Sequence, residues 1–250
     1  MTYWCESNYD ISYYIAEFFN TVSSLSLIFA GLAGMYFHRT FEKRFIITFG
    51  SLTVVGLGSV AFHGTLLFPL QMLDELPMVY AILALTYCCI EDRPYRRYGT
   101  WFPVGIALYG LMTTIVMLFA GPDNHLLEFV VFQSSFACAV ITVISRTIKM
   151  YHGIEDADIK HLWKRTALIF AVSYLLWNID FRLCDVVQTL PLGLWNPQLH
   201  AVWHVGAACC SYMSALLVCH NRSENMGRRP VMRWKLGLLP YVVENHTKST

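Results

Sequence analysis

Residues 45–63 read FIITFGSLTVVGLGSVAFH, a stretch of 19 residues without a single Asp, Glu, Lys or Arg. An α-helix needs about 20 mostly apolar residues to cross the hydrocarbon core of a bilayer, so this stretch predicts a transmembrane helix. The rest of the 250-residue chain has the same character, because 56% of its residues are hydrophobic and only 14% are charged. A soluble domain usually carries about 25% charged residues. The sequence therefore predicts an all-α, polytopic membrane protein.

Six further apolar stretches accompany this one. No linker and no fixed-period repeat separates them, so we expect a single domain over residues 1–250, built as a seven-transmembrane-helix bundle with a cytosolic tail at 220–250. The net charge of +1, without a basic stripe, argues against a nucleic-acid-binding protein. The high apolar content excludes a disordered chain. The expected spans are 14–37, 45–63, 72–90, 101–120, 126–145, 163–180 and 200–219.

The basic residues indicate the orientation. In a seven-span arrangement, every Lys and Arg except Arg182 falls on one side. Because Lys and Arg concentrate in cytosolic loops, we expect a luminal N-terminus and a cytosolic C-terminus. The N-terminal MTYWCESNYD lacks the pattern of a cleavable signal peptide. The basic residues on the cytosolic side are Arg39, Lys43, Arg44, Arg93, Arg96, Arg97, Arg146, Lys149, Lys160, Lys164, Arg165, Arg222, Arg228, Arg229, Arg233, Lys235 and Lys248.

The orientation separates the eight cysteines into two groups. Cys5 and Cys184 fall on the luminal side, in a compartment that permits disulfide formation. We therefore hypothesise a Cys5–Cys184 disulfide between the N-terminal segment and the loop before the last span. The other six cysteines lie in spans or at their cytosolic ends, where we expect small packing residues.

Several ionisable residues lie within the expected spans, where each costs at least about 2.5 kcal/mol and calls for a partner or a function. The direction of each helix places most of them at one depth, near the luminal face. Such a layer indicates a functional site. The ionisable residues in or beside spans are Glu17, His63, Asp74, Glu75, Glu128, Asp180, His200 and His204.

His200 and His204 are four residues apart, which places both imidazoles on one helix face. His63 supplies a third nitrogen at the same depth, and three protein ligands with an open fourth position are typical of catalytic zinc. Ser59 lies one turn before His63, and Asp74 follows across a short luminal turn. The spacing also allows other interpretations: histidines that only pack, a small Ser59 that lets helices approach, or a haem held by His63 and His204.

Seven blocks of sequence resemble the alkaline ceramidases, a family of seven-span zinc amidases of secretory-pathway membranes. The resemblance covers nearly the whole chain. The blocks are WCESNY (4–9), AEFFNT (16–21), GS (58–59), FHGTL (62–66), QMLDE (71–75), WNID (177–180) with Cys184, and HAVWH (200–204).

The resemblance implies roles for individual residues. It implies zinc ligands at His63, His200 and His204, catalytic roles for Ser59 and Asp74, and a disulfide between Cys5 and Cys184. It also implies a regulatory calcium bound by the backbone carbonyl of Trp4 and the side chains of Glu6, Asn8 and Glu17, an all-oxygen set that suits this ion. The family usually has an aspartate where this chain has Tyr3, and fewer ligand charges weaken calcium affinity.

The activity implied is hydrolysis of the amide bond of ceramide, dihydroceramide or phytoceramide by a zinc-activated water, giving a sphingoid base and a free fatty acid. The resemblance further implies a multi-pass protein of the endoplasmic reticulum or Golgi membrane with no obligate protein partner. The alternative is a receptor of the progestin and adiponectin receptor type, which has a related zinc site but the opposite expected orientation.

Overall fold

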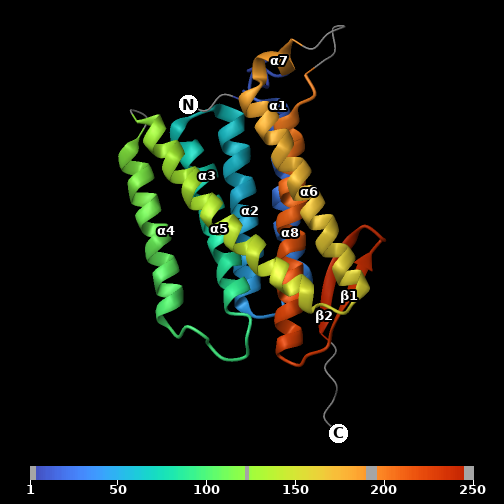
Figure 1. The fold of residues 1–250 in the computed structure, drawn as a ribbon. Helices are drawn as coiled ribbons and strands as arrows, with labels where there is room; N and C mark the ends of the chain where they lie inside the picture. The colour runs from blue at the N-terminus through green and yellow to red at the C-terminus, as the bar shows by residue number, and fades with distance from the viewer. Residues whose placement is uncertain (1–3, 122–123, 190–195, 245–250) are drawn as a thin grey trace.

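The computed structural model describes residues 4–121, 124–189 and 196–244. Within these ranges, seven helices of 20 residues or more form an elongated bundle (Figure 1). A short helix, α7, lies at one end of the bundle, and two strands lie at the other. The long helices are α1 (Phe18–Phe37), α2 (Lys43–Thr65), α3 (Phe68–Ile90), α4 (Trp101–Ala120), α5 (His125–Gly153), α6 (Ala157–Arg182) and α8 (Leu199–Asn225). The remaining elements are α7 (Cys184–Gln188), β1 (Pro230–Lys235) and β2 (Leu239–Glu244).

Each of the seven expected spans coincides with one of the long helices. Among the described residues, 6 helices are long and apolar enough to cross a membrane, namely α1 to α5 and α8. The helix that does not meet this criterion is α6, which carries Lys160, Lys164 and Arg165 near its start and Asp180 and Arg182 at its end. The fold is therefore that of a helical membrane protein.

The first helix begins later than the sequence predicted. Residues 14–17 were expected inside the first span, but α1 starts at Phe18 and Glu17 is its extended N-cap residue. The physical reason is backbone pairing with the end of α2: the N–H of Ala16 donates to the carbonyl of Gly64 at 3.1 Å, and that of Glu17 to His63 at 2.9 Å. This pairing holds Glu17 directly against His63.

Helices α2 and α3 are joined by a tight connection. Leu66 ends α2 in a left-handed conformation with φ of 55°, and α3 begins two residues later with a proline in its first turn. The two helices are therefore antiparallel neighbours, and the last turns of α2 face the first turns of α3. At Gly58 the backbones approach so closely that a Cβ atom would lie 1.9 Å from the carbonyl oxygen of Leu73. Only glycine permits this contact.

Helix α8 lies at the centre of the bundle. Residues 215–220 are all buried, which is the pattern of a helix surrounded on every side. The largest buried cluster forms around it and includes Phe45, Phe49, Leu216 and Val242. The bundle thus holds α8 firmly, together with the two histidines in its first turns.

The tail contains a feature that the sequence did not predict. Helix α8 continues to Asn225, and the strands β1 and β2 then form an antiparallel hairpin. The hairpin packs on the bundle: the Tyr212 hydroxyl donates to the carbonyl of Pro240 at 2.7 Å, and the N–H of Val242 donates to Nε2 of His38 at 3.2 Å.

Candidate active site and metal centre

Three histidines meet near one end of the bundle. His63 lies in the last turn of α2, and His200 and His204 lie in the first turns of α8. One ligand nitrogen from each of the three side chains lies within 4.8 Å of the others, and all three residues are buried. The ring centroids of His200 and His204 are 4.6 Å apart, as their spacing along one helix face predicted. The structure therefore brings together the three histidines that the sequence singled out.

Hydrogen bonds orient two of the imidazoles. Nδ1 of His63 lies 2.5 Å from the carboxylate of Glu17. Nδ1 of His204 lies 2.8 Å from the Ser23 hydroxyl and 3.1 Å from the carbonyl of Asn20. In each case Nδ1 is occupied, so Nε2 is the nitrogen available to a metal. A carboxylate or carbonyl behind a histidine is the usual support for metal ligation.

His200 differs from the other two. Its Nδ1 is buried and has no hydrogen-bond partner among the described residues. Its ring stacks on Trp4, with centroids 3.7 Å apart and an interplanar angle of 22°. A buried polar nitrogen without a partner is costly, and a metal ion would satisfy it. Three buried imidazoles, two of them oriented from behind, thus fit a metal ion.

Ser59 and Asp74 complete this end of the bundle. A carboxylate oxygen of Asp74 lies 4.0 Å from Nε2 of His63. The Ser59 hydroxyl lies beside the Asp74 carboxyl group and 2.9 Å from the Ser24 hydroxyl. The close approach at Gly58 lies directly beside both residues, since a Cβ atom there would lie 3.0 Å from the backbone nitrogen of Asp74. Both side chains predicted to be catalytic therefore lie beside the histidines.

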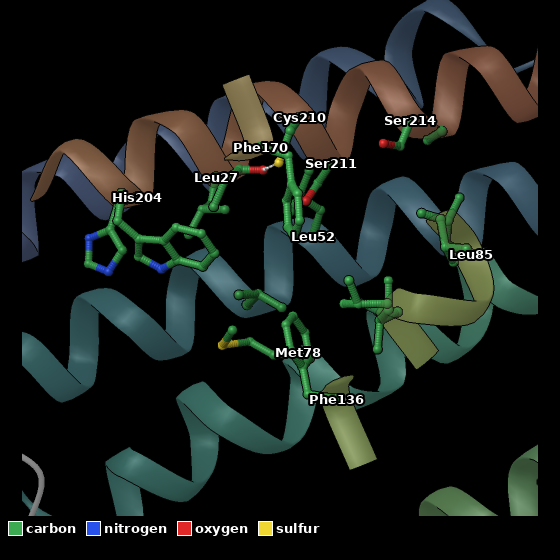
Figure 2. Close-up of a pocket in the computed structure, with 18 of the residues that line it drawn as sticks. Leu27, Leu52, Met78, Leu85, Phe136, Phe170, His204, Cys210, Ser211 and Ser214 are labelled. Atoms are coloured by element: carbon green, nitrogen blue, oxygen red, sulfur yellow. Dashed lines mark hydrogen bonds between the residues drawn. The ribbon is translucent and has the colours of Figure 1, made fainter. Parts of the chain in front are cut away.

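A cavity of about 390 Å³ opens from this cluster into the bundle. Ser59, Asp74, Glu75, His200 and His204 line its polar end, and its remaining wall is mostly aliphatic and aromatic. Figure 2 shows His204 near one end of the labelled residues and Leu85 near the other, with Met78 and Phe136 between them. Along α8 the wall runs from His200 to Leu217, a rise of about 25 Å. The shape and polarity suit a long alkyl chain attached to a polar group.

Two other acids of the membrane layer find partners away from the histidines. The side-chain amide of Gln71 donates to Glu75 at 2.9 Å and to Glu128 at 3.2 Å, which links α3 to α5. Glu128 and Gln71 are buried, whereas Glu75 also reaches the cavity. These acids therefore belong to a polar bridge between helices.

The residues expected to bind calcium are only partly brought together. The carboxylate of Glu6 caps α1 by accepting the N–H groups of Phe19 at 2.6 Å and Asn20 at 2.9 Å, while Asn8 is exposed. Burial raises the pKa of Glu6 above its usual value against these two donors, and the nearby carboxylates of Glu17 and Asp180 raise it further. Neighbouring buried acids of this kind suit a cation. Tyr3 lies outside the described residues.

The hypothesised disulfide is present. Cys5 and Cys184 are joined, with Cα atoms 5.2 Å apart. The carbonyl of Cys5 accepts the side-chain amides of Gln188 at 3.1 Å and Asn196 at 2.6 Å, and its N–H donates to Asp180 at 3.2 Å. The N-terminal segment is thereby fixed over the histidines, where Trp4 forms part of the cavity wall.

Sequence reasoning missed the supporting residues on α1. Asn20, Ser23 and Ser24 contact His204 or Ser59, yet none of them was expected to belong to the site. A signal was available, because Glu17, Asn20 and Ser24 follow helical spacing along one face of an otherwise apolar helix. It identifies α1 as the fourth helix of the site, after α2, α3 and α8.

Comparisons with known proteins identify the family of the chain. A protein-family model described as "Ceramidase" matches residues 1–243. The chain is 32% identical to mouse alkaline ceramidase 3 over 251 residues, covering 96% of this chain and 90% of that protein. It is 33% identical to an alkaline ceramidase of Arabidopsis thaliana over 240 residues, covering 95% of this chain and 90% of the relative. It is 27% identical to the alkaline ceramidase YPC1 of Saccharomyces cerevisiae over 259 residues, covering 93% and 81% respectively.

Proposed function

Because the chain belongs to the ceramidase family, we propose that it hydrolyses the amide bond of ceramides to a sphingoid base and a free fatty acid. One observation carries the proposal: the histidines, Asp74 and Ser59 converge at the polar end of an otherwise apolar cavity. Ceramide has the same division, since its amide and hydroxyl groups lie at one end of two alkyl chains. Dihydroceramide and phytoceramide share this chemistry and are included as substrates.

We propose zinc as the metal and His63, His200 and His204 as its ligands. Neutral imidazoles are common zinc ligands, and three of them leave a coordination position for a substrate or water. When bound, zinc supplies Lewis acidity, which makes water a better nucleophile at neutral pH and polarises a carbonyl group. Glu17 supports the site by holding Nδ1 of His63, so that Nε2 of the same ring faces the cluster.

Asp74 is the proposed general base and acid. Its carboxylate accepts a proton from the attacking water, whose oxygen forms a bond to the amide carbon. The carboxyl group then donates this proton to the nitrogen as the C–N bond breaks, and the sphingoid base leaves as an amine. The other product retains the water oxygen as a carboxylic acid. The position of Asp74, 4.0 Å from His63, supports this role.

Ser59 is proposed to stabilise the tetrahedral intermediate. Its hydroxyl lines the cavity beside Asp74 and donates to the oxygen that becomes negative when water adds to the carbonyl. The Ser24 hydroxyl, 2.9 Å away, holds Ser59 in place.

We further propose the complete topology that the charges indicate: seven spans including α6, a luminal N-terminus and a cytosolic C-terminus, in the endoplasmic reticulum or Golgi membrane. The N-terminal segment, which Cys5 joins to α7, and the hairpin lie at opposite ends of the bundle, as an odd number of spans requires (Figure 1). Helix α6 lines the cavity with Trp163, Thr166 and Phe170 and packs against α8, and these contacts support its inclusion as a span.

Calcium is a separate proposal. Trp4, Glu6, Asn8 and Glu17 are its proposed ligands, with the buried acids Glu6 and Glu17 as the strongest support. Bound there, the ion would join the N-terminal segment to the start of α1 and stabilise the position of Trp4 over His200.

The alternatives receive less support. A haem with two axial histidines needs its imidazoles on opposite faces of the porphyrin, but the rings of His63 and His204 have centroids only 4.9 Å apart. The receptor interpretation has no specific observation in its favour, since the family match and the relatives are ceramidases.

The deciding experiment uses the purified full chain in lipid nanodiscs with ceramide as substrate. We expect the protein to release fatty acid, to stop doing so when a chelator removes the metal, and to resume when zinc is added. The His200→Ala protein should release none. Mass spectrometry of both products gives the measurement. A folded, zinc-loaded protein that releases no fatty acid from ceramide, dihydroceramide or phytoceramide would refute the proposed function.

A further inference from the structure

The turn of the C-terminal hairpin exposes apolar side chains outside the helices. Leu236 is 88% exposed and Leu238 is 82% exposed, although both follow a strand that packs on the bundle. Trp234 beside them is 43% exposed. Outside the spans, such a patch is unfavourable in water and indicates a surface that is covered in the working molecule.

The backbone of the turn makes the leucine at position 236 more unusual. Leu236 has φ of 52° and Gly237 has φ of 70°, so both central residues are left-handed. Hairpins with this backbone strongly prefer Asn, Asp or Gly at the first central position. Leucine is strained there, and its exposed side chain gains no packing within the described protein to offset the strain. Neither the backbone nor the packing of the described residues explains a leucine at this position.

Unpaired cations lie on the same hairpin as these apolar side chains. Arg229, Arg233 and Lys235 are exposed, and none forms an ion pair with an acid in the part of the chain that the structure describes. Arg228, by contrast, binds Glu244 at 3.2 Å. Exposed Leu and Trp flanked by Arg and Lys match the chemistry of an anionic lipid surface.

The hairpin is held at a position where such a surface would lie. The contacts of Tyr212 with Pro240 and of His38 with Val242 fix it to the middle of α8 and to the end of α1. In Figure 1 the hairpin runs back alongside the bundle, past the start of α6. Its turn therefore lies beside the helices and not beyond their ends.

We propose that the hairpin turn, Trp234–Leu238, inserts into the interface of the cytosolic leaflet, with Arg233 and Lys235 binding the headgroups of anionic phospholipids. The insertion anchors the cytosolic end of α8 to the membrane. It rests on the proposed cytosolic position of the tail and not on the hydrolysis of ceramide, so the two can fail separately.

The test places an environment-sensitive fluorophore on the turn. The Leu236→Cys protein, in a background with the exposed Cys138 and Cys209 changed to serine, is labelled and reconstituted at one chain per nanodisc. The matched control is Val231→Cys, an exposed position at the base of the same hairpin. We expect a blue-shifted emission at position 236, quenched by lipids that carry a nitroxide near the headgroup, and a smaller effect at position 231.

Lipid charge supplies the second measurement. We expect insertion to be stronger in discs that contain phosphatidylserine than in discs of phosphatidylcholine alone. Arg233→Gln and Lys235→Gln should each lower the ratio of inserted to free turn about fivefold in anionic discs. Emission typical of water in every lipid would overturn the proposal. A shift that needs two chains per disc would also overturn it, because a second copy would then cover the turn.

Discussion

The carboxylate of Glu17 lies 2.5 Å from Nδ1 of His63, and both side chains are only 1% exposed. The contact joins the start of α1 to the end of α2 and fixes which nitrogen of His63 faces the other histidines. Glu17 therefore belongs to the proposed calcium site and also supports the proposed zinc site. Comparing its substitution with that of a residue that belongs to the calcium site alone distinguishes the two roles.

Glu17→Gln should lower the affinity for zinc, because the amide binds the imidazole less strongly than a carboxylate does. Loss of such a supporting group typically costs about 10- to 100-fold in metal affinity. The measurement is the zinc content of the purified protein during titration with a chelator. Asn8→Ala removes an exposed side chain of the proposed calcium site and is the control. Equal zinc retention in both variants would show that Glu17 does not support His63.

Ser59→Ala and Asp74→Asn should impair catalysis while leaving the metal bound. We expect kcat to fall about 10²- to 10³-fold for Ser59→Ala, and about 10²- to 10⁴-fold for Asp74→Asn, with small changes in KM. Steady-state kinetics with ceramide, alongside the zinc content of each variant, gives the test. Full activity in Asp74→Asn would remove this residue from the mechanism.

Gly58→Ala should separate Ser59 from Asp74. The added methyl group would lie 1.9 Å from the Leu73 carbonyl oxygen, so α3 must move away from α2. Overpacking of this kind costs about 1–3 kcal/mol, and we expect lost activity together with a lower melting temperature. Gly105→Ala is the matched control, since no atom lies within 4 Å of the Cβ position there. If Gly58→Ala behaves like Gly105→Ala, the close approach does not set the geometry of the site.

Removal of the disulfide should loosen the segment over the histidines. Cys5→Ser breaks a bridge between residues 179 positions apart, and losing a native disulfide typically costs about 2–5 kcal/mol. We expect a lower melting temperature and faster loss of zinc to a chelator. Cys138→Ser changes a free, exposed cysteine and should have little effect. An unchanged melting temperature in Cys5→Ser would contradict the expected stabilising role.

The ion pair between Arg222 and Glu42, at the end of the bundle away from the histidines, should make the stability of the fold depend on pH. Arg222 binds Glu42 through two hydrogen bonds of 2.8 and 3.2 Å. Burial acts to raise the pKa of Glu42, but Arg222 and Arg44 outweigh it and hold the pKa below its usual value. A carboxyl group with a lowered pKa in the folded state stabilises the fold above its unfolded-state pKa. This stabilisation is lost as the pH falls through the folded-state value.

Glu42→Gln should therefore melt earlier than the unchanged protein at neutral pH, and the difference should shrink in acid. Melting curves across this pH range give the measurement. Glu155→Gln alters an exposed acid and is the control. A difference that stays constant down to acid pH would show that the charge of Glu42 contributes nothing to stability.

The sequence predicted what depends on repeating patterns. Apolar stretches of sufficient length located all seven long helices, and the spacing of His200 and His204 placed both on one face of α8. The charge pattern brought Cys5 and Cys184 to the same side, and their disulfide is confirmed. Helix direction placed His63, Ser59 and Asp74 at one depth, and the structure brings them together.

The sequence could not predict features that arise from irregular backbone. The hydrogen bond between Glu17 and His63 depends on the extended backbone of the residues before α1. Their apolar sequence instead predicted that the first helix already includes them. The capping of α1 by Glu6 needs the N-terminal segment to fold back, which no local signal specifies. The hairpin of β1 and β2 is short and lies in what was expected to be only a cytosolic tail, and the contact of Tyr212 with Pro240 fixes its place on the bundle.

The stacking of Trp4 on His200 also has a consequence for biosynthesis. A ribosome makes Trp4 and Cys5 first, whereas their partners His200 and Cys184 emerge only near the end of translation. The site thus assembles when the last span enters the membrane, and every shorter intermediate lacks two of the three histidines. With the proposed roles of the three histidines, a nascent chain that ends before His204 has no complete metal site, and we expect it not to cleave membrane lipid.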